Sequence, residues 1–459
     1  MARGADAPGP VMQRLSSYMA EARDRTLPAE VIEKTKHHTL DTLAAMVSGS
    51  KLPTGRVALA FARANASAGG ATVAGSTLLC PPMEAALANG MLAHSDETDD
   101  SHSPSQSHPG CAVIPAALAT GEKLGVDGTR FLRAIALGYD IGPRVTMTLG
   151  ALAYMDESHR STHSISAEFG AAAAAGSVAN LSEQQMRWLL DYASQQASGI
   201  AAWQRDTEHI EKSLVFAGFG ARSGVAAALL VQAGGTGLAD IFSGADNFFA
   251  AFNPKADPEK LIDKLGERYE VTRTSIKKWT VGSPIQAPLD ALQIMFGKRI
   301  FAADDVRSVV VRVATNEASI VNNREIPDIC LQHMVAVMLL DKTASFQAAH
   351  DLGRMKDPAV LKQRAKVQLI PDEELQRKLP QREAIVELTF NDGTKLTERV
   401  EAVRGAPENP MTREEVVAKA RDLMTPVLGA EKCNRLIDRI LNLENVSNVR
   451  DLRPLLQTA

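Results

Sequence analysis

The sequence predicts a mainly α-helical protein that carries a smaller α+β segment. Alanine-rich text with helical spacing fills the first half of the 459-residue chain. Aromatic residues make up only 5% of the chain, which favours closely packed helices over a β-sandwich. The composition changes near Leu265 to strand-like alternation, and helical spacing returns after Pro410. We therefore expect the C-terminus to rejoin the first, helical domain.

The first half is expected to form a succession of helices. Pro28 suits a first helical turn, because a proline there has no backbone N–H to leave unpaired. Apolar residues then recur at helical spacing, and glycine-rich text from Gly69 to Ser76 is typical of a connector. The expected helices cover Val11 to Arg25, Pro28 to Ser48, Val57 to Ala64, Pro82 to His94, an alanine-rich stretch that begins near Val113, and Gly128 to Leu149.

The later segment contains the strand signals. Alternating residues predict strands over 306–314, 366–370 and 383–390, and Asn-Asp-Gly-Thr after Phe390 predicts a hairpin turn into a further strand, 396–403. We expect these strands to be antiparallel. A buried helix is predicted over Asp328 to Asp341, and helices return over 412–424 and 430–443.

Composition excludes several classes of function. The net charge of −4 gives no electrostatic footprint for nucleic acid or a membrane surface, and no apolar stretch approaches the roughly 20 residues of a membrane span. The four cysteines form no CxxC pair, so reduced thiols in a cytoplasm fit best. The glycines from Gly234 to Gly244 follow no predicted strand, so we expect no dinucleotide or ATP. Among the ligand classes considered, a small-molecule substrate is the one that the composition does not exclude.

One stretch, Asn89 to Glu122, contains most of the carboxylate and imidazole side chains that are candidates for a functional site. Pro104 and Pro109 place it on a loop between helices, and no lysine or arginine occurs from Asn89 to Thr120. Crowded carboxylates and imidazoles are suited to proton transfer or substrate binding. A metal site and a merely helix-capping loop are the alternatives, although neither HExxH nor DxDxDG is present. The charged and imidazole side chains are those of His94, Asp96, Glu97, Asp99, Asp100, His102 and His108.

Further polar side chains interrupt the helical text. His159 and His163 stand just ahead of a small-residue helix, where they form either a structural pair or part of an anion site at the helix start. Lys212 lies in a cationic, glycine-flanked stretch that is either a solvated helix face or a substrate contact. His333 lies on the apolar helix, where a core histidine is the ordinary interpretation.

The loop sequence NGMLAHSDETDDSH, followed by HPGCAVIPAALATGE, resembles the signature of the MmgE/PrpD family. That family includes 2-methylcitrate dehydratase, cis-aconitate decarboxylase and iminodisuccinate epimerase. FGAAAAAG, ARSGVAAALL, FSGADNFFAAF and DICLQHMVAVMLLD follow in the family's order, so the resemblance covers nearly the whole chain. It implies a homodimeric enzyme without cofactor or metal, with an active site between a large helical domain (1–268, rejoined by 411–459) and a smaller α+β lid (269–410).

The resemblance also implies roles for individual residues. Glu97, Asp100 and His108, with His163 or His159, correspond to acid/base positions, and His102 in the same loop is a further candidate. The positions that correspond to substrate contacts are Ser101, Lys212, Lys277, Gln286 and His333. Three positions depart from the family pattern, because relatives carry Asp at Glu97, His at Gln286 and, in decarboxylases, Tyr at His333.

These features predict a lyase that acts on a small di- or tricarboxylate. Removal of a proton next to a carboxylate needs a base near neutral pKa and fixed cations to receive the developing charge. The loop supplies the base, and Lys212 and Lys277 supply the fixed cations. Dehydration is favoured, with decarboxylation as a related outcome. Epimerisation is the first alternative, and a metal-dependent hydrolase or an inactive carboxylate-binding homologue is the second.

Overall fold

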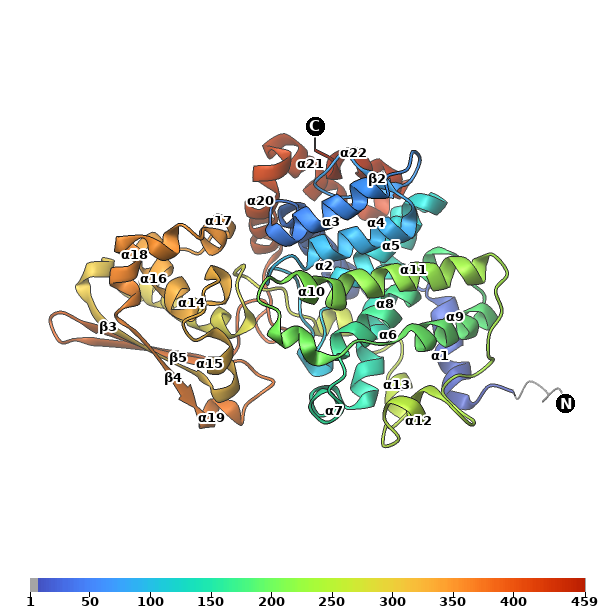
Figure 1. Cartoon of the computed structure of the whole chain (residues 1–459), viewed down its shortest axis with the longest axis horizontal. Coiled ribbons are helices and arrows are strands. Elements are labelled where there is room, and N and C mark those ends of the chain that lie inside the picture. The colour runs from blue at the N-terminus through green and yellow to red at the C-terminus, as the bar shows by residue number, and fades with distance from the viewer. Residues whose placement is uncertain (1–6, 459) are drawn as a thin grey trace. The chain divides into compact units, whose positions relative to one another are not determined.

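The computed structural model describes residues 7–458 and divides into two compact units (Figure 1). The first unit comprises the chain up to Ser95, Asp99–Thr274 and the chain from Val416 onwards. The second comprises Ser275–Glu415 and a three-residue piece of the acidic loop, Asp96–Thr98. The long segment of the second unit therefore begins and ends slightly later than the expected 269–410, and the loop piece was not anticipated.

The first unit is almost entirely helical, as expected. A short antiparallel pair, β1 (Ala71–Thr72) with β2 (Leu79–Cys80), lies where only a connector was predicted. The helices are α1 (Pro10–Glu21), α2 (Ala29–Gly49), α3 (Pro53–Ala64), α4 (Pro82–Ala93), α5 (Gly110–Leu124), α6 (Gly128–Leu149), α7 (Ala151–Ser158), α8 (Thr162–Val178), α9 (Glu183–Gln196), α10 (Ile210–Ser213), α11 (Phe219–Gln232), α12 (Phe248–Phe252), α13 (Glu259–Ile262), most of α20 (Arg413–Leu428), α21 (Ala430–Leu441) and α22 (Arg453–Leu456).

Helix α8 is the centre of this unit, packed between α6 and α11. Its small residues allow the neighbouring backbones to approach closely. A Cβ added at Gly142 of α6 would lie 2.3 Å from the Ser166 carbonyl oxygen, and one at Gly224 of α11 would lie 2.4 Å from the Ala172 nitrogen. The alanine- and glycine-rich text thus specifies close helix packing, which fixes the start of α8 within the unit.

The C-terminal helices return to the first unit through two ion pairs, one of which is fully buried. Lys419 of α20 lies 2.6 Å from Asp41 of α2, and Lys36 of α2 lies 2.6 Å from Glu444, just after α21. Lys419 and Asp41 are both buried, so each charge requires the other. The expected rejoining of the chain's two ends therefore has a specific ionic basis.

Helices α10 and α11 are joined without interruption by a π-helical turn, Leu214–Gly218. Together they form a 23-residue helix, Ile210–Gln232, that is long and apolar enough to cross a membrane by length and composition alone. The prediction from sequence counted only uninterrupted apolar runs and therefore missed this helix. More than half of its apolar window, 56%, is buried against the rest of the protein, as in a core helix.

The second unit contains a four-stranded sheet in the order β4-β3-β5-β6. The strands are β3 (Val306–Ala314), β4 (Val367–Asp372), β5 (Ala384–Phe390) and β6 (Lys395–Val400). Their positions match the prediction, but the expectation of a wholly antiparallel sheet was wrong, because β4 runs parallel to β3, with Val309 opposite Val367. Only the β3–β5 and β5–β6 pairs are antiparallel. The helices of this unit are α14 (Ser283–Lys298), α15 (Thr315–Val321), α16 (Leu331–Asp341), α17 (Phe346–His350), α18 (Pro358–Arg364) and α19 (Glu373–Gln376).

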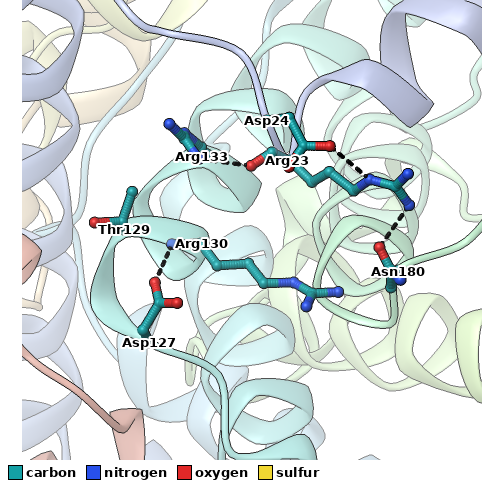
Figure 2. A pocket seen from close by; sticks show the side chains of 7 residues that line it. All are labelled: Arg23, Asp24, Asp127, Thr129, Arg130, Arg133 and Asn180. Carbon is teal, nitrogen blue, oxygen red and sulfur yellow. Dashed lines mark hydrogen bonds and ion pairs between the residues drawn. The ribbon is translucent and has the colours of Figure 1, made fainter.

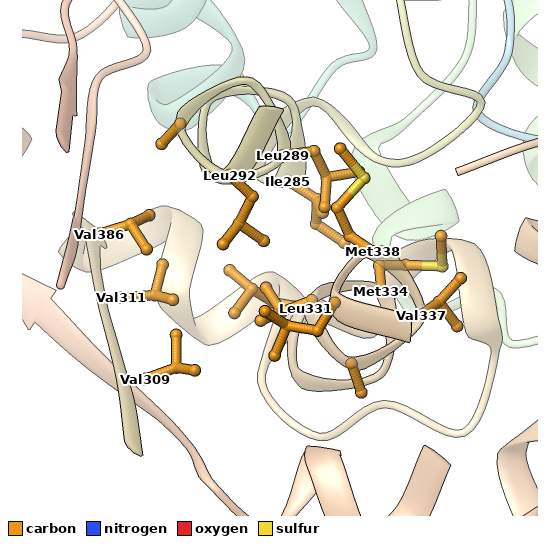
Figure 3. Close-up of a cluster of buried hydrophobic side chains, with 14 of the residues drawn as sticks. Ile285, Leu289, Leu292, Val309, Val311, Leu331, Met334, Val337, Met338 and Val386 are labelled. Atoms are coloured by element: carbon orange, nitrogen blue, oxygen red, sulfur yellow. The ribbon is translucent and has the colours of Figure 1, made fainter. Parts of the chain in front are cut away.

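Alternation along β3 gives the sheet one apolar face, on which α14 and α16 pack (Figure 3). Val309 and Val311 are fully buried on that face, while Arg312 on the other face is exposed. A half-buried strand therefore supplies the core of the second unit, as its period of two predicts.

Candidate active site

The acidic loop joins α4 to α5 and is buried along most of its length. Every residue from His94 to His102 is at most 8% exposed, although nearly all are polar or charged. Ser103–Ser105 forms a short 3-10 turn that includes Pro104, and the His102 backbone N–H donates to the Ser107 carbonyl at 2.8 Å, which closes the loop on itself. Buried charges require partners, so these partners identify what each side chain does.

Asp99 lies between two imidazoles. Its carboxylate accepts hydrogen bonds from Nδ1 of His94 at 2.9 Å and from Nδ1 of His108 at 3.3 Å. Burial alone would raise the pKa of Asp99, but the two imidazoles hold that pKa well below its ordinary value. An ionised Asp99 fixes the proton of each neutral ring on Nδ1, so the lone pair of His108 is on Nε2. This is the tautomer that a general base at Nε2 requires.

His163, at the start of α8, lies beside His108, with ring centroids 5.4 Å apart. Ser161 caps this helix, and its side chain accepts from the backbone N–H of Ser164. His163 is buried, and its Nδ1 has no hydrogen-bond partner among the described residues. Burial, with the neighbouring His108 and Lys212, holds the pKa of His163 well below its ordinary value. His163 is therefore a neutral imidazole near neutral pH.

Phe216 gathers the rings into one group. It stacks on His163 at 3.9 Å between centroids and on His94 at 4.7 Å, and it meets Trp203 edge-on at 4.6 Å. Phe216 lies on the π-helical turn, which packs against Gly90 of α4. Single π-helical turns are frequent at functional sites. The aromatic ring on which the imidazoles stack therefore comes from an irregular turn in the long apolar helix.

Lys212 supplies a cation to the same group. Its Nζ lies 5.2 Å from the centroid of the Phe216 ring and 5.7 Å from that of Trp203. Its backbone N–H is held by Asp206 at 2.9 Å. His209, on the turn before α10, lies 5.1 Å from His94 between ring centroids. We name the assembly of His94, Asp99, His108, His163, Trp203, His209, Lys212 and Phe216 the histidine cluster.

Asp100, a predicted acid/base residue, points elsewhere. Its carboxylate accepts from Nδ1 of His38 at 2.8 Å, from the Tyr139 hydroxyl at 2.5 Å and from the Gly110 backbone N–H at 3.0 Å. These donors belong to α2, α6 and α5. The structure thus places Asp100 as an anchor that fixes the loop to three helices.

His102 is also separate from the histidine cluster. Its Nδ1 lies 2.7 Å from the Ser105 hydroxyl, and its Nε2 lies 3.2 Å from a carboxylate oxygen of Glu270. Glu270 also binds Arg268 at 2.8 Å and Arg273 at 2.6 Å. Both ring nitrogens of His102 are therefore engaged in a buried ionic network. Burial lowers the pKa of His102, although Glu270 opposes this effect.

The two histidines that the sequence left as alternatives have different surroundings. His163 joins the histidine cluster, whereas His159 is exposed at the end of α7 with a φ of 58°. The His159 carbonyl accepts the Ala201 N–H at 2.9 Å. Ser101 is 8% exposed within the loop, between Asp100 and His102. His163 is therefore the histidine that the structure brings to His108.

The second unit holds the remaining loop residues. Lys277 is buried, and its Nζ donates to the Glu97 carbonyl at 2.9 Å and lies 3.5 Å from the Glu97 carboxylate. Asp96 pairs with His350 Nε2 at 2.8 Å and accepts from both the backbone and the hydroxyl of Thr98. Glu97 and Lys277 are thus brought together, and His350 is a neighbour that the sequence did not suggest.

Gln286 and His333 have local surroundings in the second unit. The Gln286 amide accepts from the Trp279 N–H at 3.1 Å and donates to the carbonyls of Trp279 and Val281, so it shapes the turn before α14. His333 is fully buried on α16, and neither ring nitrogen has a hydrogen-bond partner among residues 7–458. Burial, with the nearby positive charge of Arg364, lowers the pKa of His333 to about 4.

One set of side chains has donor atoms spaced for a metal ion within the described residues. A nitrogen of His94, an oxygen of Asp99 and the sulfur of Cys111 lie within 4.8 Å of one another. Metal binding by cysteine needs the thiolate. Burial, with the charge of Asp99, raises the pKa of Cys111 well above its ordinary value, and its thiol donates to the His108 carbonyl at 3.1 Å. These groups therefore suit mutual hydrogen bonding better than metal binding.

Comparison with known proteins agrees with the resemblance. The model of the MmgE/PrpD N-terminal domain matches residues 13–261, and that of the C-terminal domain matches residues 279–445. A cis-aconitate decarboxylase-like protein, oryM, from Aspergillus oryzae is 26% identical, covering 98% of this chain and 97% of the relative. The cis-aconitate decarboxylases of Aspergillus terreus and Homo sapiens are 25% and 26% identical, each covering 94% of this chain and 92% and 91% of the relative.

Proposed function

Because this chain belongs to the MmgE/PrpD family of carboxylate-processing enzymes, we propose that it is a cofactor-independent lyase acting on a small di- or tricarboxylate. The observation that supports this most is the pairing of His108 with His163 beside Lys212. The similarity to proteins named cis-aconitate decarboxylases favours C–C cleavage over the dehydration that we expected from sequence. A homodimer in the cytoplasm is part of the same proposal.

Proton transfer is assigned to His108. Its Nδ1–H donates to Asp99, whose negative charge stabilises the imidazolium that forms when Nε2 takes up a proton. In decarboxylation, the bond to the departing carboxylate breaks, CO₂ leaves, and the electron pair remains on the substrate carbon. The His108 imidazolium then protonates that carbon. In dehydration, the same nitrogen removes the proton, the C–H electron pair forms the double bond, and the hydroxyl on the next carbon leaves with its bonding pair and takes up a proton to become water.

Charge stabilisation is assigned to Lys212 and to His163. Lys212 holds a substrate carboxylate, and a fixed cation of this kind also stabilises the carbanion-like charge as it develops. Lys277, which the sequence offered as another carboxylate contact, lies in the second unit, where its Nζ donates to the Glu97 carbonyl. His163 is neutral, so it forms hydrogen bonds to substrate oxygens without adding a charge of its own.

Epimerisation is the second candidate. Two imidazoles 5.4 Å apart can remove a proton from one face of a carbon and return one to the other face. Epimerisation would use the same residues as the lyase reaction, and the two reactions differ in what happens to the carbanion.

Turnover in D₂O tests the proposal. We expect that a screen of small di- and tricarboxylates, cis-aconitate included, will identify a substrate whose product carries deuterium on the carbon next to a carboxylate. NMR and ultraviolet absorbance assign the outcome, because CO₂ release or a new alkene indicates a lyase and an inverted centre indicates an epimerase. For a decarboxylation or an epimerisation, turnover without deuterium uptake would contradict proton transfer. A dehydration removes this hydrogen instead of adding one, so its product need carry no deuterium, and the kinetics of His108→Gln test the base in that case. Binding without turnover would favour a carboxylate-binding homologue.

A further inference from the structure

A polar pocket lies in the helical unit, apart from the histidine cluster, which contributes none of its lining residues. It has a volume of about 490 Å³ and opens where the segment after α1 meets the start of α6 (Figure 2). Three arginines dominate its lining. The lining residues are Arg23, Asp24, Asp127, Thr129, Arg130, Arg133 and Asn180.

The two acidic side chains of this arginine pocket are already engaged. Asp24 accepts from Nε of Arg23 at 3.0 Å. Asp127 caps α6 by accepting the Arg130 backbone N–H at 2.8 Å. The guanidinium of Arg23 also donates to the side-chain oxygen of Asn180 at 2.5 Å. Arg23 is thus held in place, and its positive charge is balanced by Asp24.

The other two arginines have no carboxylate partner. Within residues 7–458, no acidic oxygen lies within ion-pair distance of Arg130 or Arg133. Arg133 donates only to the carbonyl of Arg23 at 2.8 Å, and the buried Nε of Arg130 has no hydrogen-bond partner. Partial burial and the charge of Arg23 lower the pKa of Arg130, while the charges of Asp127 and Asp24 oppose this effect. Arg130 and Arg133 are both partly buried, so an anion in the pocket would stabilise their positive charges.

The separation of the two arginines along α6 suits a shared ligand. Residues three apart on a helix are neighbours on its surface, and Arg130 and Arg133 of α6 both line the pocket (Figure 2). Guanidinium groups bind phosphate oxygens through paired hydrogen bonds. A phosphate carries a charge of about −1.5 to −2 at neutral pH, which matches two unpaired guanidinium groups better than the single charge of a monocarboxylate does.

We propose that the arginine pocket binds a phosphate group, either as free phosphate or as part of a small phosphomonoester, through Arg130 and Arg133. The pocket has more volume than a free phosphate occupies, so a phosphomonoester has room for its organic part. Thr129 and Asn180 line the pocket and offer additional polar groups. This proposal is independent of the lyase activity.

Isothermal titration with inorganic phosphate and with phenyl phosphate, at fixed ionic strength, tests the proposal. We expect saturable binding to the intact protein, with a dissociation constant that Arg130→Gln raises by about 10-fold or more, because a charge-assisted contact is lost. Arg14→Gln is the matched control, because Arg14 is exposed on α1 outside the pocket. Tighter binding of phenyl phosphate than of phosphate would identify the phosphomonoester as the ligand.

Three results would overturn the proposal. They are the absence of saturable phosphate binding, equal weakening by Arg130→Gln and Arg14→Gln, and tighter Arg130-dependent binding of succinate than of phosphate. Arg130→Gln should fold normally, because the replaced guanidinium has no ion-pair partner. If its thermal unfolding midpoint without phosphate falls, Arg133→Gln provides the same test with the same expected result.

Discussion

Asp99 and Asp100 are neighbours in the chain and are both fully buried, but their carboxylates have different kinds of partner. The partners of Asp99 include two imidazoles, whose protons can be exchanged near neutral pH. Asp100 is held by His38, Tyr139 and a backbone N–H, and burial raises the pKa of the Tyr139 hydroxyl well above its ordinary value. His38 is also an imidazole, so the difference lies in the other two partners of Asp100, because neither the tyrosine nor the backbone can release a proton under ordinary conditions.

The same contrast separates two histidines of the loop. His108 faces His163 within the histidine cluster, whereas His102 has both ring nitrogens engaged by Ser105 and Glu270. Residue type and burial are therefore insufficient to identify a catalytic group. The partners of each side chain divide the loop into residues that contact the histidine cluster, to which we assign proton transfer, and residues that hold the loop in place.

The largest effect is expected from His108→Gln. Loss of a positioned acid/base group should reduce turnover of the substrate by about 10² to 10⁴. The fold should be retained, because glutamine preserves a polar side chain beside Asp99. Steady-state kinetics on the substrate identified in the D₂O screen measures the change, with circular dichroism as the check on folding.

His159→Gln is the matched control for this change. His159 is an exposed histidine that precedes the same helix as His163, and it lies outside the histidine cluster. Its replacement should leave turnover within about two-fold of wild type, as is usual for surface substitutions. A loss at His159 equal to that at His108 would contradict the assignment of the proton-transfer residues.

A second pair of variants tests the two aspartates against each other. Asp99→Asn keeps the shape but removes the charge that stabilises the His108 imidazolium, so turnover should fall by about 10²-fold. Asp100→Asn leaves buried donors with poorer partners and should lower the free energy of unfolding by about 1 to 3 kcal/mol. Turnover per folded molecule and urea denaturation separate the two effects.

The opposite results for the two variants would contradict the difference in role between Asp99 and Asp100. If Asp100→Asn abolished turnover in a protein of undiminished stability, Asp100 would have to act in the chemistry. If Asp99→Asn affected stability alone, the histidine cluster would be a structural feature of the helical unit.

Local patterns explain why so much of the fold was predictable. The helices begin near Pro28 and Pro82, and β3 occupies the nine residues that alternate, because proline placement and side-chain period act over a few residues. Strand direction is not a local property. The predicted helix at 328–341 lies between β3 and β4, and a parallel connection needs such a crossover, so that signal was present but not used.

The candidate site was predictable as a region but not as a set of roles. Composition identified the acidic loop, because an excess of carboxylates and imidazoles without lysine or arginine is visible in the sequence. The roles depend on partners that lie far away in the chain, such as His38 for Asp100 and Glu270 for His102. Phe216 was missed because its helix was considered only for its cations, and a π-helical turn has no sequence signature.

The stabilisation that Asp96, another carboxylate of the loop, provides should depend on pH, because its partner is His350 of the second unit. Although burial lowers the pKa of His350, the hydrogen bond and charge of Asp96 raise it from 6.5 to about 9. Asp328, whose carboxylate lies 3.9 Å from the same ring nitrogen, also favours the charged form, and the Phe346 carbonyl accepts from Nδ1 at 2.7 Å. In contrast to His163, His350 is therefore expected to be positively charged at neutral pH.

This raised pKa determines the direction of the pH dependence. The folded protein binds the His350 proton more tightly than the unfolded chain does, so the stabilisation is fully present below pH 6.5 and is lost as the pH rises through about 9. Thermal unfolding of the wild-type protein should therefore lose on the order of 1 to 3 kcal/mol over this interval. In His350→Gln that part of the pH dependence should be absent, while Lys278→Gln, which removes a partly exposed charge of the second unit, should retain it. An unchanged pH profile in His350→Gln would show that His350 is neutral in the folded protein and that the loop segment Asp96–Thr98 is held without an ion pair.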